Sequence, residues 1–235
     1  MRAIYKREVK AYLTSMTGYI YMGIFLAFTG LYFTAYGLIS GYPEFGYVVS
    51  SLHIAFLILT PILTMRSLAE ERRQKTDQIL LTSPVSLGNV IIGKYLAILT
   101  IFTIPMLIIS LYPLILSSFG TVSMPMSYTA ILGAWLFGAA CLAIGLFVSS
   151  LTENLVVAAV LTFGVLFFCN MASGISNIIS ASGILQKVLD AVYIYGKFTN
   201  FLNGILDVTG IVYYISVAGL FLFLTVQSLQ KRRWS

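Results

Sequence analysis

The sequence predicts an all-α membrane protein with six transmembrane helices. Its 235 residues are 59% hydrophobic and only 9% charged, which excludes an ordinary soluble domain. Several uncharged stretches are long enough to cross a bilayer, since one span takes about 20 apolar residues. The basic residues gather at a few places between these stretches, as they do in polytopic membrane proteins.

The uncharged stretches give the spans directly. The stretch 95–152 is long enough for two spans, with a turn at 117–125, and each of the other stretches holds one. No linker indicates a second domain, so we expect one transmembrane domain over 1–235. The predicted spans occupy residues 17–40, 47–66, 95–117, 128–149, 154–171 and 210–229.

The orientation follows from the basic residues. Twelve of the 14 Lys and Arg residues lie in 2–10, 66–94 and 231–233, which share one side of a six-span chain. Only Lys187 and Lys197 lie on the other side. The excess of positive charge predicts that both termini face the cytoplasm of a multi-pass inner-membrane protein. The net charge of +6 is therefore divided among patches that face lipid headgroups, and it does not indicate nucleic-acid binding.

Two segments outside the spans are amphipathic. Residues 1–16 have one apolar and one basic face, which predicts an interfacial helix along the inner leaflet. Residues 172–209 are too polar to span but hold many large aliphatic side chains. We expect them to form short re-entrant helices in the outer leaflet, packed against the first and fifth spans. Gly174 and Gly183 are candidate breaks in these helices, and Gly204 is a candidate turn toward the last span.

Residues 66–94, which are the loop 67–94 and the preceding Arg66, hold eight of the 22 charged residues. We expect these charged side chains to lie in water. Leu68–Thr82 lacks Gly and Pro and predicts a helix that Pro84 ends, and Ser86 can cap a second helix. Two interpretations stay open. The segment is either a solvated loop between spans or a docking surface for a soluble partner.

The order of residues in 66–94 is distinctive. It reads RSLAEERR from Arg66, then has Thr76, ILLTSPVS from Ile79, and Gly93-Lys94. This pattern resembles the cytoplasmic loop of type-2 ABC exporter permeases, in the branch that holds the gliding-motility and nitrous-oxide-reductase-maturation permeases. The resemblance continues at 150–154, 198–207 and 229–234, and it departs from the branch at Lys197, where a histidine is expected.

The resemblance implies a function and a set of site residues. The loop would be a coupling helix that sits in a groove of a separate ABC ATPase subunit, and two permease subunits, alike or different, would meet around a path through the lipid membrane. ATP and Mg²⁺ would bind to the ATPase, with no cofactor on this chain. The implied coupling residues are Glu70, Glu71, Arg72, Thr76, Leu80, Leu81, Pro84, Gly93, Lys94 and Glu153. The implied outer gate is Phe198, Phe201, Gly204 and Asp207.

Two features of the polar segments have simpler alternatives. Glu153 is also favoured at the start of the fifth span by the helix dipole, with Thr152 as the cap. Gly88 to Lys94 fits most of a phosphate-binding P-loop, but Tyr95 stands where Ser or Thr would bind Mg²⁺. ATP hydrolysis is therefore expected in another polypeptide, and no catalytic or metal-binding residue is predicted here.

A few residues within the spans are candidates for a substrate path. Phe25, Tyr32 and Tyr36 lie close to one helix face, and His53 is the only histidine. Packing between helices is the alternative explanation for each of them. A row of small residues in the fourth span is a candidate seam, either between subunits or within the bundle. The row consists of Ala134, Gly138, Cys141, Gly145 and Ser149.

The rival function is an ATPase-independent membrane carrier or a membrane-embedded enzyme. An ion-coupled carrier should show acidic residues within its spans, and an enzyme should show paired carboxylates, a metal cluster or a nucleophile with its base. The predicted spans contain none of these. The sequence therefore favours a permease, and it selects no substrate.

Overall fold

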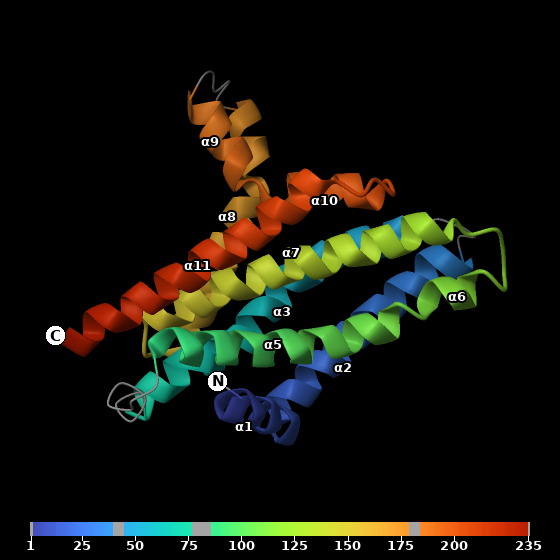
Figure 1. Cartoon of the computed structure of the whole chain (residues 1–235). Helices are drawn as coiled ribbons and strands as arrows, with labels where there is room; N and C mark the ends of the chain where they lie inside the picture. The colour runs from blue at the N-terminus through green and yellow to red at the C-terminus, as the bar shows by residue number, and fades with distance from the viewer. Residues whose placement is uncertain (1, 40–44, 77–85, 179–183, 235) are drawn as a thin grey trace.

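The computed structural model describes residues 2–39, 45–76, 86–178 and 184–234. This part of the chain is helical, contains no strand, and has six helices long and apolar enough to cross a membrane. The prediction of an all-α membrane protein is confirmed. Figure 1 shows an elongated bundle with both termini, the end of α3 and the start of α5 toward the same end.

The helices follow one another through short connections. Pro61 and Pro105 lie inside α3 and α5 without ending them. The third span breaks near Ser110, so that the short helix α6 completes it. The elements are α1 (Arg2–Thr14), α2 (Met16–Tyr32), the π-helical turn η1 (Phe33–Ile39), α3 (Gly46–Arg73), α5 (Leu87–Ile109), α6 (Tyr112–Leu116), α7 (Met124–Leu151), α8 (Leu155–Ile178), α9 (Ile184–Val192), α10 (Ile194–Leu202) and α11 (Val208–Trp234).

The fourth span, α7, is the centre of the bundle because small residues let its neighbours approach closely. A methyl group added at Gly138 would lie 2.3 Å from the ring of Phe102 in α5, and one at Gly145 would lie 2.4 Å from Thr64 in α3. All five residues of the predicted small-residue seam are buried within this one chain. Of the two interpretations, the structure supports a seam within the bundle.

A helix, α1 (Arg2–Thr14), forms where the interfacial helix 1–16 was predicted. Its apolar face packs in part against the protein's own spans, with Tyr12 buried. The Tyr12 hydroxyl donates a hydrogen bond of 3.0 Å to the Leu63 carbonyl in α3, and the Tyr5 hydroxyl lies 3.0 Å from the Thr100 hydroxyl in α5. Helix α1 is therefore fixed to two spans and can move with them.

The loop 67–94 differs from the predicted elbow. No separate helix begins at Leu68, because α3 continues without a break to Arg73. Lys75 then adopts the left-handed backbone conformation (φ 57°), which ends the helix, and Thr76 N–H donates to Glu71 O at 3.0 Å. Pro84, the predicted stop, lies outside the described residues. The second predicted helix begins after Ser86, although the Ser86 hydroxyl makes no capping bond, and it continues into the third span as α5.

The outer segment contains the predicted short helices, with two corrections. The fifth helix does not break at Gly174, because α8 continues to Ile178 and one glycine costs a helix only about 1 kcal/mol. The part of α8 that is apolar enough to span ends at Ala172, next to the predicted end at 171. Helix α10 lies against α7, α3 and α8, not against the first span. Gly183 lies outside the described residues. The predicted turn at Gly204 is confirmed, with φ 79°.

Candidate functional site

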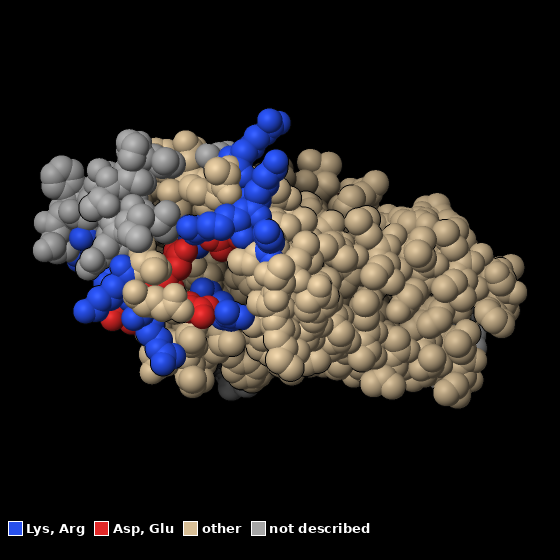
Figure 2. Space-filling view, turned by 90° about the horizontal axis from the view of Figure 1, so that it is seen from below, with Lys and Arg blue, Asp and Glu red and all other residues tan. Residues whose placement is uncertain are grey.

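Charged side chains gather at one end of the molecule. Figure 2 shows Lys, Arg, Asp and Glu at this end and a wholly uncharged surface along the rest of the face in view. The charges described at this end come from α1, from the last turns of α3, from the start of α5, from the turn before α8 and from the end of α11. Segments far apart in the sequence therefore meet where the sequence predicted the cytoplasmic side.

The centre of this end is a four-residue ion-pair network, here called the Lys94 cluster: Arg7, Glu8, Glu71 and Lys94. Lys94 Nζ lies 2.8 Å from Glu71 Oε1 and 3.1 Å from Glu8 Oε1, and it donates to the Ser67 carbonyl at 3.1 Å. The Arg7 guanidinium contacts both carboxylates, at 2.7 and 3.2 Å. Lys94 is 1% exposed. The cluster is electrically balanced and joins α1, α3 and α5.

The network also sets the ionisation of its members. Burial raises the pKa of the Glu8 carboxyl, but the nearby Lys94 ammonium and the Arg7 guanidinium outweigh it and hold that pKa below its usual value. The hydrogen bond to Glu8 raises the pKa of Arg7 in turn, against the effect of its partial burial. Glu8 and Arg7 are therefore charged at neutral pH.

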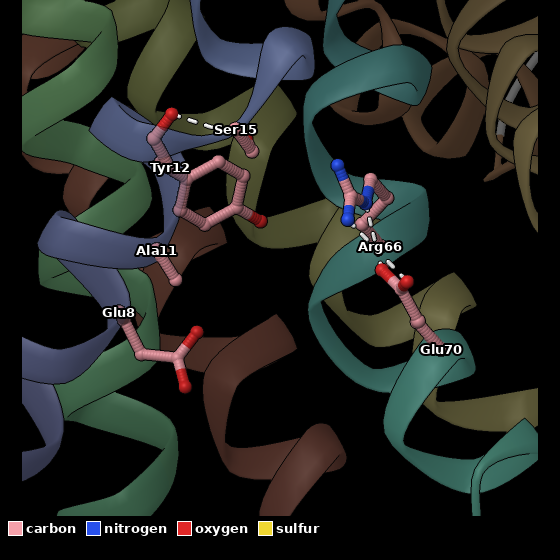
Figure 3. A pocket seen from close by; sticks show the side chains of 6 residues that line it. All are labelled: Glu8, Ala11, Tyr12, Ser15, Arg66 and Glu70. Atoms are coloured by element: carbon pink, nitrogen blue, oxygen red, sulfur yellow. Dashed lines mark hydrogen bonds and ion pairs between the residues drawn. The ribbon is translucent and has the colours of Figure 1, made fainter.

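A groove separates α1 from the end of α3 beside the cluster. Its cavity of about 410 Å³ is lined by Arg7, Glu8, Glu70, Gln74 and Thr76, among others. Figure 3 shows a smaller pocket that shares part of this lining, in which Glu8 and Tyr12 of α1 face Arg66 and Glu70 of α3. Arg66 Nε donates to Glu70 Oε2 at 2.7 Å, and Arg66 also bonds to the Thr17 hydroxyl. The groove therefore carries both signs of charge.

A second ion-pair group joins the remaining helices at this end. Glu153, in the turn between α7 and α8, lies 3.1 Å from Arg232 of α11 and 3.7 Å from Arg72 of α3. The Arg72 guanidinium also donates to the Ser150 carbonyl. Glu153 is 60% exposed, so these pairs contribute little stability on their own. Their effect is positional, because they hold the end of α11 against α3.

The Ser149 hydroxyl makes an unusual contact between α7 and α3. It donates to Met65 O at 3.2 Å and accepts from Ala69 N–H at 3.1 Å, two groups that form one rung of the α3 helix. A side chain inserted at a rung is a common cause of local bending in a helix. Ser149 thus anchors the charged end of α3 directly to the central helix.

The structure separates the predicted coupling residues into internal and exposed groups. Glu71, Gly93 and Lys94 are partly or wholly buried inside the chain, and Arg72 is only 9% exposed. The expectation that the charges of 66–94 lie in water is therefore wrong for these residues. Glu70 is paired with Arg66, and Thr76 is exposed in the turn after α3. Leu80, Leu81 and Pro84 lie outside the described residues.

The turn before α8 also differs from prediction. Asn154, and not Thr152, caps this helix, since its side-chain oxygen accepts from Val156 N–H at 3.0 Å. Glu153 is engaged by the two arginines described above. Its role in the structure is therefore an internal ion pair, which neither of the two sequence interpretations included.

The predicted outer-gate residues lie together at the other end of the bundle. Phe198 and Phe201 are 0% exposed, and the Phe198 ring stacks on Phe137 of α7 at 5.5 Å between centroids. Gly204 makes the turn after α10. The Asp207 carboxylate accepts from the Asn200 amide at 2.9 Å and from Thr209 N–H at 2.9 Å, which joins α10 to the start of α11.

The predicted path-lining residues differ in how far they are exposed. Phe25 is 0% exposed and packs against Phe56 and Phe102 in the core. Tyr36 is 40% exposed, and its ring stacks on Tyr32 at 5.9 Å. His53 is half-buried, lies 2.5 Å from the Ser50 carbonyl and packs on the Tyr195 ring of α10 at 4.6 Å.

Several residues of the charged end escaped the sequence analysis. In the sequence analysis, Arg7 lies on the basic face of residues 1–16, Arg232 among the basic residues 231–233 and Ser149 in a row of small residues, and Glu8 is not singled out. Glu8 is the single acidic residue among the first 43. An isolated acid on a basic helix face is the signal that could have suggested a buried cationic partner.

Comparison with known proteins adds the family. The family model described as ABC-2 family transporter protein matches residues 3–230. The chain belongs to this family. The ABC-2 assignment makes the chain a multi-pass permease subunit with a role in transport, and it agrees with the six apolar helices. A search among curated proteins gave no match.

Proposed function

We propose that this ABC-2 permease is one half of the membrane part of an exporter driven by separate ATPase subunits. Two permeases, identical or different, enclose the path, and the ATPases bind the ATP and Mg²⁺ while this chain binds no cofactor. The loop motif of this chain resembles that of the gliding-motility and nitrous-oxide-reductase-maturation branch, to which we propose that the chain belongs. The charged end faces the cytoplasm of the inner membrane.

The observation that carries the proposal is the linked charged end. The Lys94 cluster joins α1, α3 and α5, Ser149 joins α3 to α7, and Glu153 joins α3 to α11. A displacement of the end of α3 would therefore be transmitted to α1, α5, α7 and α11 through these side-chain contacts. This is what a permease needs if a partner at the membrane surface is to move its spans.

We propose that the docking contacts do not include Glu71, which is partly buried inside the chain. Glu71 is occupied by Lys94 and Arg7, so reversing its charge would damage the permease itself. The exposed residues 73–76, at the tip of α3 beside the α1 groove, are free to face a partner. We assign the described part of the docking surface to this tip, with Thr76 retained from the sequence prediction.

Reversing the charges of the tip should weaken ATPase binding without unfolding the permease. For the double variant Arg73→Glu and Lys75→Glu, we expect the affinity for a co-expressed ATPase subunit to fall about tenfold or more, or about 1.4 kcal/mol. Copurification measures the complex, and thermal unfolding of the isolated permease measures its stability.

The matched control is Lys10→Glu, a charge reversal at an exposed position of α1. It should leave both measurements unchanged. If the tip variant retains its ATPase and couples hydrolysis to transport normally, the docking assignment is wrong.

The proposed orientation has a direct test. Cysteines placed at Gln74 and Ser118, both exposed at opposite ends of the bundle, should react with a membrane-impermeant thiol reagent from inside and outside respectively. Cys141 and Cys169 are first replaced by alanine. Labelling in the reverse sense would overturn the cytoplasmic assignment of the charged end.

The outer end supports a gate in the same proposal. Helix α10 packs over α7 through Phe198 and Phe201, and the Gly204 turn and Asp207 position it against α11. Tyr32, Tyr36 and His53 remain the proposed path-lining residues, with Phe25 reached only if the core helices part.

A further inference from the structure

A groove runs along the side of the bundle between α5, α7 and α11. It has a cavity of about 290 Å³, lined in part by Tyr95, Trp135, Tyr214, Ile215 and Gly219. Ile215 at its rim is 60% exposed. A methyl group added at Gly219 would meet nothing within 4 Å, so the groove is a true hollow beside α11.

The polar groups in the wall of this groove are already satisfied by the protein. The Tyr95 hydroxyl donates to Ala139 O at 3.0 Å, and the Tyr214 hydroxyl donates to Ile194 O at 2.9 Å. The indole N–H of Trp135 donates to the Thr103 hydroxyl at 2.9 Å. A water molecule needs two to four polar partners, and a polar ligand needs at least some. The wall therefore presents a carbon surface to any occupant.

The groove lies at the depth of the hydrocarbon. Trp135 is near the middle of α7, which runs from 124 to 151, and Gly219 is near the middle of α11, from 208 to 234. At 1.5 Å per residue, each lies roughly 17 Å from the start of its helix. At this depth of a span, a surface that no other protein covers meets lipid chains.

We propose that the groove between α5, α7 and α11 binds one acyl chain of a membrane phospholipid. A chain of this kind fills an apolar hollow without needing a hydrogen bond, and it restores the dispersion contacts that an empty groove loses. A second copy of the protein fits the site less well. Ile215, Leu220 and Phe223 are each more than half exposed along α11, and such side chains keep another helix at a distance.

Trp135 provides a natural reporter of this site. The chain has two tryptophans, so the Trp234→Phe variant leaves Trp135 alone. We expect its fluorescence to fall by about one half in phosphatidylcholine vesicles whose chains carry bromine near the bilayer centre, because quenching requires near van der Waals contact. Acrylamide, a water-soluble quencher, should have little effect.

A filled groove should lose this response. On the Trp234→Phe background, Gly219→Leu places a side chain in the hollow, where its Cβ would meet nothing within 4 Å, and should abolish most of the quenching by brominated chains. The matched control is Gly164→Leu on α8, where an added methyl group also meets nothing within 4 Å. It should leave the quenching unchanged.

Each other outcome overturns the proposal. Strong quenching by acrylamide would show a water-filled groove. Weak quenching by both agents would show that protein, such as a second copy, covers Trp135. Equal quenching with and without Gly219→Leu would show that the chains reach Trp135 from outside the groove.

Discussion

Lys94→Met is expected to lower the free energy of unfolding by about 3–5 kcal/mol, because it removes the cation from a buried ion-pair network. Lys94 is 1% exposed, and its partners Glu8 and Glu71 are 12% and 18% exposed. Methionine keeps most of the volume of the side chain, so the loss reports charge and not packing. The midpoint of thermal unfolding in detergent measures it.

Two controls separate the network from a general effect of charge. Lys75→Met, at the exposed turn after α3, should change stability by less than about 0.5 kcal/mol. Combining Lys94→Met with Glu8→Gln and Glu71→Gln should restore part of the loss, since Arg7 alone then no longer has to balance two partly buried carboxylates. If Lys94→Met unfolds at the wild-type temperature, the Lys94 cluster does not hold the charged end together.

The sequence predicted the spans well because their cause is local. Each span is a long uncharged stretch, and in lipid such a stretch satisfies its backbone only as a helix. The ends of the helices depend on other causes. Gly204 was recognised as a turn because glycine adopts a positive φ freely. Lys75 makes the same kind of helix end, yet a lysine carries no such signal, so the end of α3 at Arg73 was missed.

The charged end shows more strongly that local sequence does not reveal contacts made in the folded chain. A high density of charge in 66–94 indicated exposure to water, and that inference fails when the balancing charges come from elsewhere. Glu8 lies 86 residues before Lys94 in the chain and 3.1 Å from it in the fold. Local composition shows that a charge is present, but its burial depends on tertiary partners that one sequence cannot reveal.

Gly133→Ala is expected to force α10 away from α7 at the outer end. The added methyl group would lie 2.4 Å from Phe201 Cβ and 2.7 Å from its Cγ. Phe201 Cβ is fixed to the backbone of α10, so no side-chain rotation relieves this clash and the helix itself must shift. Overpacking of this kind costs about 1–3 kcal/mol. Thermal unfolding, together with amide exchange over 194–202, measures the effect.

Phe201→Ala tests the same contact from the other side. It removes a 0% exposed ring and should cost about 3–5 kcal/mol if the cavity stays open. The double variant Gly133→Ala and Phe201→Ala should lose only slightly less than the two single losses together. The contact of 2.7 Å with Cγ is removed, but alanine at 201 keeps the Cβ atom that the new methyl group meets at 2.4 Å. Gly164→Ala is the control, since its methyl group meets nothing within 4 Å.

The transport readout connects this contact to the proposed gate. Reconstituted transporters with Phe198→Ala and Phe201→Ala should leak or lose transport while they still bind the ATPase, because the charged end lies at the opposite end of the bundle (Figure 1). Loosened packing at α10 would then open the path from outside without disturbing the docking surface. If residues 194–202 exchange their amide protons rapidly in the wild-type assembled transporter, α10 is already mobile and cannot act as a gate.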